Sequence, residues 1–217
     1  MSSYGEVCWL WTGQLLEVGG QENVVIQAAT VFISVYSLKC TPGPSMAQGR
    51  ILHALVARFP FVYVFGGYNY HSLSACEKLN LRELSWSALP NMSQPRRAFT
   101  PAVLGTDIYL VGGASMQIER FSTEQDSFEA LGLSLNEPYT SVLGLAYSNI
   151  LVFLNSKTVT EVQVTQRSLQ ILRQREVPMK DWRGSAVVLG TSAYLGLTVP
   201  EELFILDLGE LKQRTYK

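Results

Sequence analysis

A diglycine that recurs at a nearly constant interval constrains the fold of this chain more than any other feature. Two segments align without a gap at an offset of 46 residues, and in each a Met, an Arg four positions later and an apolar run lead to Gly-Gly. The first segment has Met46, Arg50 and Gly66-Gly67, and the second has Met92, Arg96 and Gly112-Gly113. Self-similarity at a period of roughly 20–50 residues indicates a repeat architecture.

Weaker copies of the same pattern lie on both sides of these segments. Gly19-Gly20 ends an apolar run 47 residues before Gly66, whereas segment 149–155 fills the equivalent position without glycines. Segment 190–196 resembles segment 105–111. We therefore predict a single domain of five units that spans nearly the whole chain, with approximate bounds 1–45, 46–91, 92–137, 138–178 and 179–217.

A second element follows each diglycine position. It is a large apolar residue followed by another one seven positions later. These pairs are Ile33 and Cys40, Leu79 and Trp86, Phe121 and Phe128, Val162 and Leu169, and Phe204 and Leu211. Residues of this size would fill the space between neighbouring sheets, so we predict that Trp86, Phe121 and Phe128 pack in the core.

Each unit has the pattern of four short strands. In the second unit we predict strands over 52–56, 61–65, 77–81 and 85–89, because short apolar runs are bounded there by Gly, Pro, Asn and Ser. Polar residues 124–126 predict a turn between strands three and four. The glycines of each Gly-Gly permit φ > 0 and leave space for a neighbouring backbone. Segment 165–175 alone shows weak helical periodicity.

These repeated residues resemble the kelch repeat. In that family an apolar run ends in Gly-Gly, a spaced Tyr and Trp follow, and a turn often contains Pro, Met and Arg. Segments 46–86 and 92–128 carry the resemblance best. Trp86 matches the tryptophan and Phe128 replaces it in the next unit, while Phe121 takes the tyrosine position and Leu79 departs from it. Residues 89–92 with Arg96 match the turn, whereas the last two units lack the diglycine.

The resemblance implies an all-β fold, a kelch-like β-propeller of four-stranded antiparallel blades around a channel. Such propellers usually have six blades, and five or seven also occur. About five units are visible here. The chain is therefore a five-bladed ring, an incomplete propeller or a ring completed by another segment, and we favour an incomplete or non-consensus propeller.

The composition excludes several classes of protein. Of the 217 residues 47% are hydrophobic and only 16% are charged, which excludes a mainly disordered chain. The net charge of −1 gives no basic field for nucleic acid. The charge-free stretches 23–38 and 138–156 are expected to be buried strands and turns, so no membrane span is predicted. Three irregularly spaced cysteines and a start without signal-peptide character favour a cytoplasmic protein.

Signals for catalysis are weak. His53 lies in an apolar strand and is expected to be a packed residue, and His71 lies in an exposed loop. No spacing links either histidine to metal-ligating residues, so neither a metal site nor a cofactor is predicted. Glu201 and Glu202 would point to opposite faces of a strand, which makes them a poor acid/base pair. We therefore predict no enzyme activity.

A binding role fits the sequence better. Loops gather at the two ends of a propeller, and aromatic residues and Arg are the side chains that most often anchor a partner. We predict partner contacts from the loop that follows the second diglycine and from the turn before the third unit: Tyr68, Asn69, Tyr70, His71, Arg96 and Arg97.

The sequence thus predicts a scaffold or adaptor that binds a protein partner through its loops. The alternative is a carbohydrate-active or copper-dependent redox enzyme on the same kind of propeller, since the resemblance also extends to such enzymes. Related chains often carry a BTB or F-box region. We identify no such helical region here, so no link to a ubiquitin ligase is predicted, and the sequence does not fix the oligomeric state.

Overall fold

A computed structural model describes residues 5–10, 12–135, 142–154, 158–165, 168–176, 186–189, 192–198, 201–207 and 213–216 of the chain. Within these ranges all regular secondary structure is β-strand. The strands are β1 (Glu6–Leu10), β2 (Gln14–Val18), β3 (Gln21–Glu22), β4 (Val25–Ile26), β5 (Thr30–Ser34), β6 (Cys40–Pro42), β7 (Ala54–Arg58), β8 (Phe61–Phe65), β9 (Cys76–Asn80), β10 (Ser85–Leu89), β11 (Phe99–Thr100), β12 (Ala102–Leu104), β13 (Asp107–Gly112), β14 (Ser115–Ser122), β15 (Ser127–Ser134), β16 (Val142–Tyr147), β17 (Ile150–Leu154), β18 (Thr158–Val164), β19 (Leu169–Glu176), β20 (Ala186–Leu189), β21 (Ser192–Thr198), β22 (Glu201–Asp207) and β23 (Gln213–Tyr216).

The strands form successive antiparallel sheets that we call blades 1 to 5. Blade 1 is β1-β2-β5-β6, blade 2 is β7-β8-β9-β10, blade 3 is β12-β13-β14-β15, blade 4 is β16-β17-β18-β19 and blade 5 is β20-β21-β22-β23. The short strand β11, which precedes blade 3, pairs in parallel with β16 of blade 4. The backbone of the segment that leads into blade 3 is therefore paired with the first strand of blade 4.

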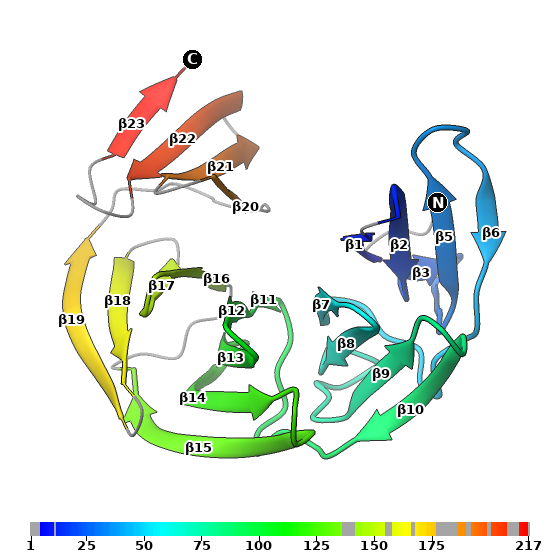
Figure 1. Ribbon diagram of the computed structural model, residues 1–217, viewed down its shortest axis with the longest axis horizontal. Helices are drawn as coiled ribbons and strands as arrows, with labels where there is room; N and C mark the ends of the chain where they lie inside the picture. Colours follow the sequence, from blue (N-terminus) through cyan, green and yellow to red (C-terminus); the bar gives the residue numbers. More distant parts are fainter. Residues whose placement is uncertain are drawn as a thin grey trace.

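The blades follow one another around an arc (Figure 1), with β1, β7, β12, β16 and β20 toward its centre and β6, β10, β15, β19 and β23 outside. Blade 1 and blade 5 lie on the two sides of the opening in this arc. Among the described strands, none of blade 1 pairs with one of blade 5. The predicted all-β propeller of about five blades is confirmed.

The predicted strands of the second unit agree closely with the structure. β8 and β10 have the predicted bounds, and β9 begins one residue earlier. β7 begins two residues later than predicted, because Leu52 has a positive φ of 53° and the chain enters the sheet only after it. The weak helical periodicity of segment 165–175 does not correspond to a helix. Its residues from Leu169 onward form β19 and pair with β18.

The seven-residue pairs hold for three blades. Ile33 and Cys40, Leu79 and Trp86, and Phe121 and Phe128 are cross-strand partners. In blade 4 the two residues are not partners, because a shift of register beside Glu161 places Val162 opposite Ile171 and Leu169 opposite Val164. In blade 5 Phe204 lies opposite Thr215, and Leu211 lies outside the described residues.

The core consists of apolar clusters between neighbouring blades. Alternate residues of β8 serve two of them, because Val62 and Val64 face blade 1 while Tyr63 and Phe65 face blade 3. Phe65 meets Phe121 edge-on at 5.2 Å between ring centroids. Phe121 is fully buried, whereas Phe128 and Trp86 are partly buried and pack against these clusters.

The diglycines bind the linker that leads to the next blade. Gly66 and Gly67 both have positive φ, and the amide of Gly67 donates to the carbonyl of Arg96 at 2.8 Å. A Cβ atom on Gly66 would lie 2.4 Å from the same carbonyl oxygen. Gly20 donates in the same way to the carbonyl of Arg50 at 3.0 Å. The glycines therefore allow the close approach that joins one blade to the next.

The arginine of each of these two linkers enters the following blade. Arg96 donates to the carbonyls of Gly112 and Gln117 and forms an ion pair with Glu119 at 2.9 Å. Arg50 forms the same kind of pair with Glu77 at 2.5 Å. Both guanidinium groups are fully buried. We call Arg50 and Arg96 the linker arginines.

His53 lies inside the junction of blades 1 and 2. Its side chain is buried, and neither ring nitrogen has a hydrogen-bond partner among the described residues. Burial, together with the positive charge of Arg50, lowers the pKa of His53 to about 3. The prediction of a packed histidine is confirmed.

We expect His53 to make the fold sensitive to acid. Because its pKa is lower in the folded state than the ~6.5 of the unfolded chain, the unfolded state takes up the proton first as the pH falls. Stability that is complete above about pH 6.5 is therefore lost below it, and the loss reaches about 2 kcal/mol at pH 5. Urea unfolding at pH 7.5 and pH 5 measures this change.

The matched comparison is with His53→Leu. The difference in unfolding free energy between the wild type and this variant should shift by about 2 kcal/mol between the two pH values. Burial raises the pKa of Glu6 to about 7, which acts in the opposite direction but is common to both proteins. A His71→Gln control should follow the wild type. Parallel pH profiles for wild type and His53→Leu would show that His53 is not the sensitive group.

Candidate partner-binding surface

The loop between β8 and β9 has a defined backbone. Tyr68 forms β-bridges with Ile51 and Ser72, and the amide of Asn69 donates to the carbonyl of His71. The side-chain amide of Asn69 donates to the carbonyl of Gly49 at 2.9 Å, which fixes the loop to the linker between blades 1 and 2. These hydrogen bonds fix the backbone of the loop and therefore the positions from which its exposed side chains project.

An arginine from the linker to blade 3 contacts an aromatic side chain of this loop. The guanidinium carbon of Arg97 lies 4.8 Å from the centroid of the Tyr68 ring, within the range of a cation–π contact. Tyr70 has a positive φ of 59°, and 78% of its surface is exposed. His71 is exposed beside it. We call Tyr68, Tyr70, His71 and Arg97 the Tyr70 surface.

The six residues predicted from the sequence therefore divide by location. Arg97 stacks on the half-buried ring of Tyr68, Tyr70 and His71 are exposed on the same loop as Tyr68, and Asn69 binds the carbonyl of Gly49. Arg96 is enclosed between blades 2 and 3, where it binds Glu119, so its side chain has no exposed surface to offer a partner. Burial lowers the pKa of Arg96, and the bond to Glu119 opposes that shift.

The repeat itself distinguishes Arg96 from Arg97. Arg96 aligns with Arg50 at the offset of 46 residues, whereas Arg97 aligns with Ile51. Both aligned arginines are buried in the same way, and the arginine without a counterpart is the exposed one. The departure of Arg97 from the repeat was therefore the sequence signal that could have separated it, as an exposed residue, from the buried Arg96.

The described part of the chain contains no group of three or more His, Cys, Asp or Glu side chains placed to hold a metal ion. Within the same ranges we find no helix with the length and apolar character of a membrane span. An apolar pocket between blades 1 and 2 is lined by residues that are far apart in the sequence, so no local pattern predicts it.

Two comparisons with known proteins agree with the fold. The kelch motif family matches residues 62–93, which include β9, β10 and all but the first residue of β8. A putative F-box/kelch-repeat protein of Arabidopsis thaliana is 34% identical over 74 residues. That match covers 32% of this chain and 31% of the relative.

Four-stranded antiparallel blades around a common centre define the class of the protein, a β-propeller. The repeated diglycines, the linker arginines and both comparisons narrow the class further. All of these features fit a kelch-repeat β-propeller.

Proposed function

We propose that this chain is a non-enzymatic protein-interaction module that contacts its partner through the Tyr70 surface. The observation that carries the proposal is the stack of Arg97 on Tyr68 beside an exposed Tyr70. Aromatic residues and Arg dominate the binding energy of protein interfaces. Here the tyrosines lie on a loop that Asn69 fixes to the neighbouring linker, and Arg97 lies in the linker to blade 3, so little conformational freedom is lost on binding.

The test is recovery of partners from an extract of the cells that make the protein, with quantitative mass spectrometry. Removing two anchor residues of an interface lowers affinity by roughly 30-fold or more. We therefore expect the Tyr70→Ala, Arg97→Glu double variant to lose its specific partners while its melting temperature stays within ~2 °C of the wild type. Both side chains are exposed, so the fold does not depend on them.

Arg175→Glu is the matched control, because Arg175 is an exposed arginine on β19 of blade 4. It should recover the same partners as the wild type. An unchanged partner set for the double variant would contradict the proposed surface. Turnover of a sugar or of a copper-dependent substrate by the purified protein would instead support the enzymatic alternative.

A further inference from the structure

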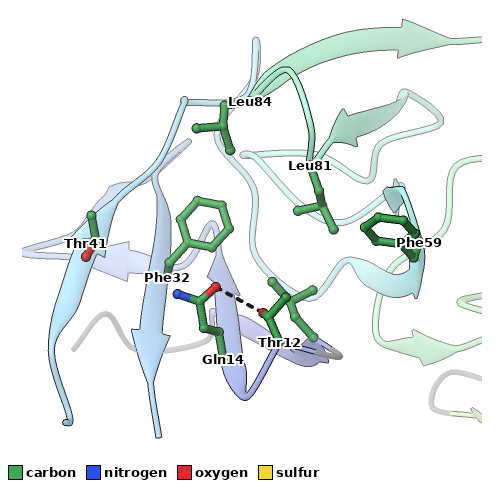
Figure 2. A pocket seen from close by; sticks show the side chains of 8 residues that line it. Thr12, Gln14, Phe32, Thr41, Phe59, Leu81 and Leu84 are labelled. Carbon is green, nitrogen blue, oxygen red and sulfur yellow. Dashed lines mark hydrogen bonds between the residues drawn. The ribbon is translucent and has the colours of Figure 1, made fainter. Parts of the chain in front are cut away.

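A pocket of about 320 Å³ lies between blades 1 and 2 (Figure 2). It is lined by the turns between β7 and β8 and between β9 and β10, whereas the Tyr70 loop joins β8 to β9. In an antiparallel blade these connections lie at opposite ends of the strands. The pocket and the Tyr70 surface are therefore separate sites at the two ends of the propeller.

The walls of the pocket are apolar. Leu10 and Phe32 come from blade 1, and Phe59, Leu81 and Leu84 come from turns of blade 2 (Figure 2). More than half of the surface of Phe59 and of Leu84 is exposed. A volume of this size with apolar walls matches the lower range of ligand sites in proteins.

Apolar exposure continues on the adjacent turn of blade 1. Tyr36 and Leu38, in the turn between β5 and β6, are 87% and 78% exposed. The Tyr36 ring lies against Gly13, next to Thr12 in the pocket, since a Cβ atom on Gly13 would meet the ring at 2.6 Å. Tyr36 therefore extends the exposed apolar surface beside the pocket, and exposed apolar surface of this kind marks a site that another molecule covers.

Leu84 occupies a backbone position that does not favour leucine. Its φ is 51°, in the left-handed region where Asn, Asp and Gly are preferred. The equivalent residue of blade 3, directly before β15, is Asp126, with a φ of 50°. The turn therefore accepts a polar residue, and the fold alone gives no reason for an exposed leucine here.

One cation stands at the apolar wall of the pocket. The guanidinium of Arg82 stacks on Phe59 at 5.2 Å, whereas Arg58, next to Phe59 in the chain, donates to the carbonyl of Gly105 in blade 3. Glu83 is the acidic residue of the same turn, and it accepts a hydrogen bond from the hydroxyl of Ser85. The Arg82 guanidinium at this wall complements a negatively charged group on a ligand.

One polar group of the lining suits a peptide backbone. The side-chain carbonyl of Gln14 accepts a hydrogen bond from the Thr12 hydroxyl at 3.2 Å (Figure 2). The amide end of Gln14 points along the side of the pocket toward Phe32 and Thr41. There it can donate to a main-chain carbonyl of a bound segment.

We propose that this pocket docks a linear peptide segment of a partner protein, with one large apolar side chain in the pocket and an acidic residue beside Arg82. The proposal does not depend on the Tyr70 surface. It adds a second contact of different chemistry at the other end of the blades.

The test uses a phage-displayed library of 12-residue peptides, selected on the full chain and counter-selected on Leu84→Asn. Asparagine suits the positive φ of this position, so the variant should keep or raise its melting temperature while it loses an apolar wall. We expect clones that share a large apolar residue next to Asp or Glu. Synthetic peptides from them should bind the wild type at least 10-fold more tightly than Leu84→Asn or Arg82→Glu.

The same peptides should bind the Tyr70→Ala, Arg97→Glu variant as they bind the wild type, which separates this proposal from the proposed function. Failure to enrich clones, enrichment of basic peptides, or equal binding by Leu84→Asn would overturn it. Sedimentation of the free protein tests the other occupant. A dimer that dissociates in Leu84→Asn would assign the pocket to a second copy of the chain instead.

Discussion

Replacing Arg96 with methionine is expected to lower the free energy of unfolding by about 3–5 kcal/mol. The substitution keeps an unbranched side chain but leaves the Glu119 carboxylate buried without its cation, since 2% of that side chain is exposed. It also removes the donors that satisfy the carbonyls of Gly112 and Gln117. Chemical denaturation at neutral pH measures the change.

Arg97→Met is the matched control, because it makes the same change one residue later at an exposed position. Its effect on stability should stay within about 0.5 kcal/mol. A double-mutant cycle with Glu119→Gln should give a coupling energy above ~1 kcal/mol between Arg96 and Glu119, because the two groups are in direct contact. Equal stabilities for Arg96→Met and Arg97→Met would refute the role of the linker arginines.

Replacing Gly66 with alanine is expected to destabilise the protein by about 3 kcal/mol or more. Left-handed backbone costs an L-residue roughly 1–2 kcal/mol, and overpacking adds about 1–3 kcal/mol. The new methyl group would lie 2.4 Å from the carbonyl oxygen of Arg96 and 2.8 Å from a methyl carbon of Met92. Because that carbonyl belongs to the linker, the blades themselves would have to move apart.

Gly105→Ala separates the two contributions. Gly105 has a φ of 60°, close to the 59° of Gly66, but an added Cβ atom would meet nothing within 4 Å. This variant should therefore lose only the backbone contribution of roughly 1–2 kcal/mol. Thermal unfolding of both variants checks the prediction, and equal losses would show that the close approach to Arg96 is unimportant.

The repeat made most of the fold predictable. Gly66-Gly67 and Gly112-Gly113 marked where neighbouring backbones approach, and β8 and β10 have the predicted bounds. These features depend on local patterns that each unit repeats. The register shift beside Glu161 has no such local pattern, because it depends on how β18 and β19 pair.

The candidate sites were less predictable, because they depend on side-chain direction. Arg96 and Arg97 are adjacent and chemically alike, but one is enclosed by blade 3 and the other stacks on Tyr68. The pocket between blades 1 and 2 joins Phe32 with Leu81 and Leu84, which are far apart in the sequence. Only the packing of two blades brings them together.

Site-specific photo-crosslinking tests the interaction role most directly. A photoreactive phenylalanine derivative placed at Tyr70 should form an adduct with a protein partner in the cells that make the chain, because this side chain is 78% exposed on the proposed surface. The same derivative at Leu172, an exposed residue of β19, should form no such adduct. The absence of an adduct at Tyr70, or the same adducts at both positions, would contradict the account.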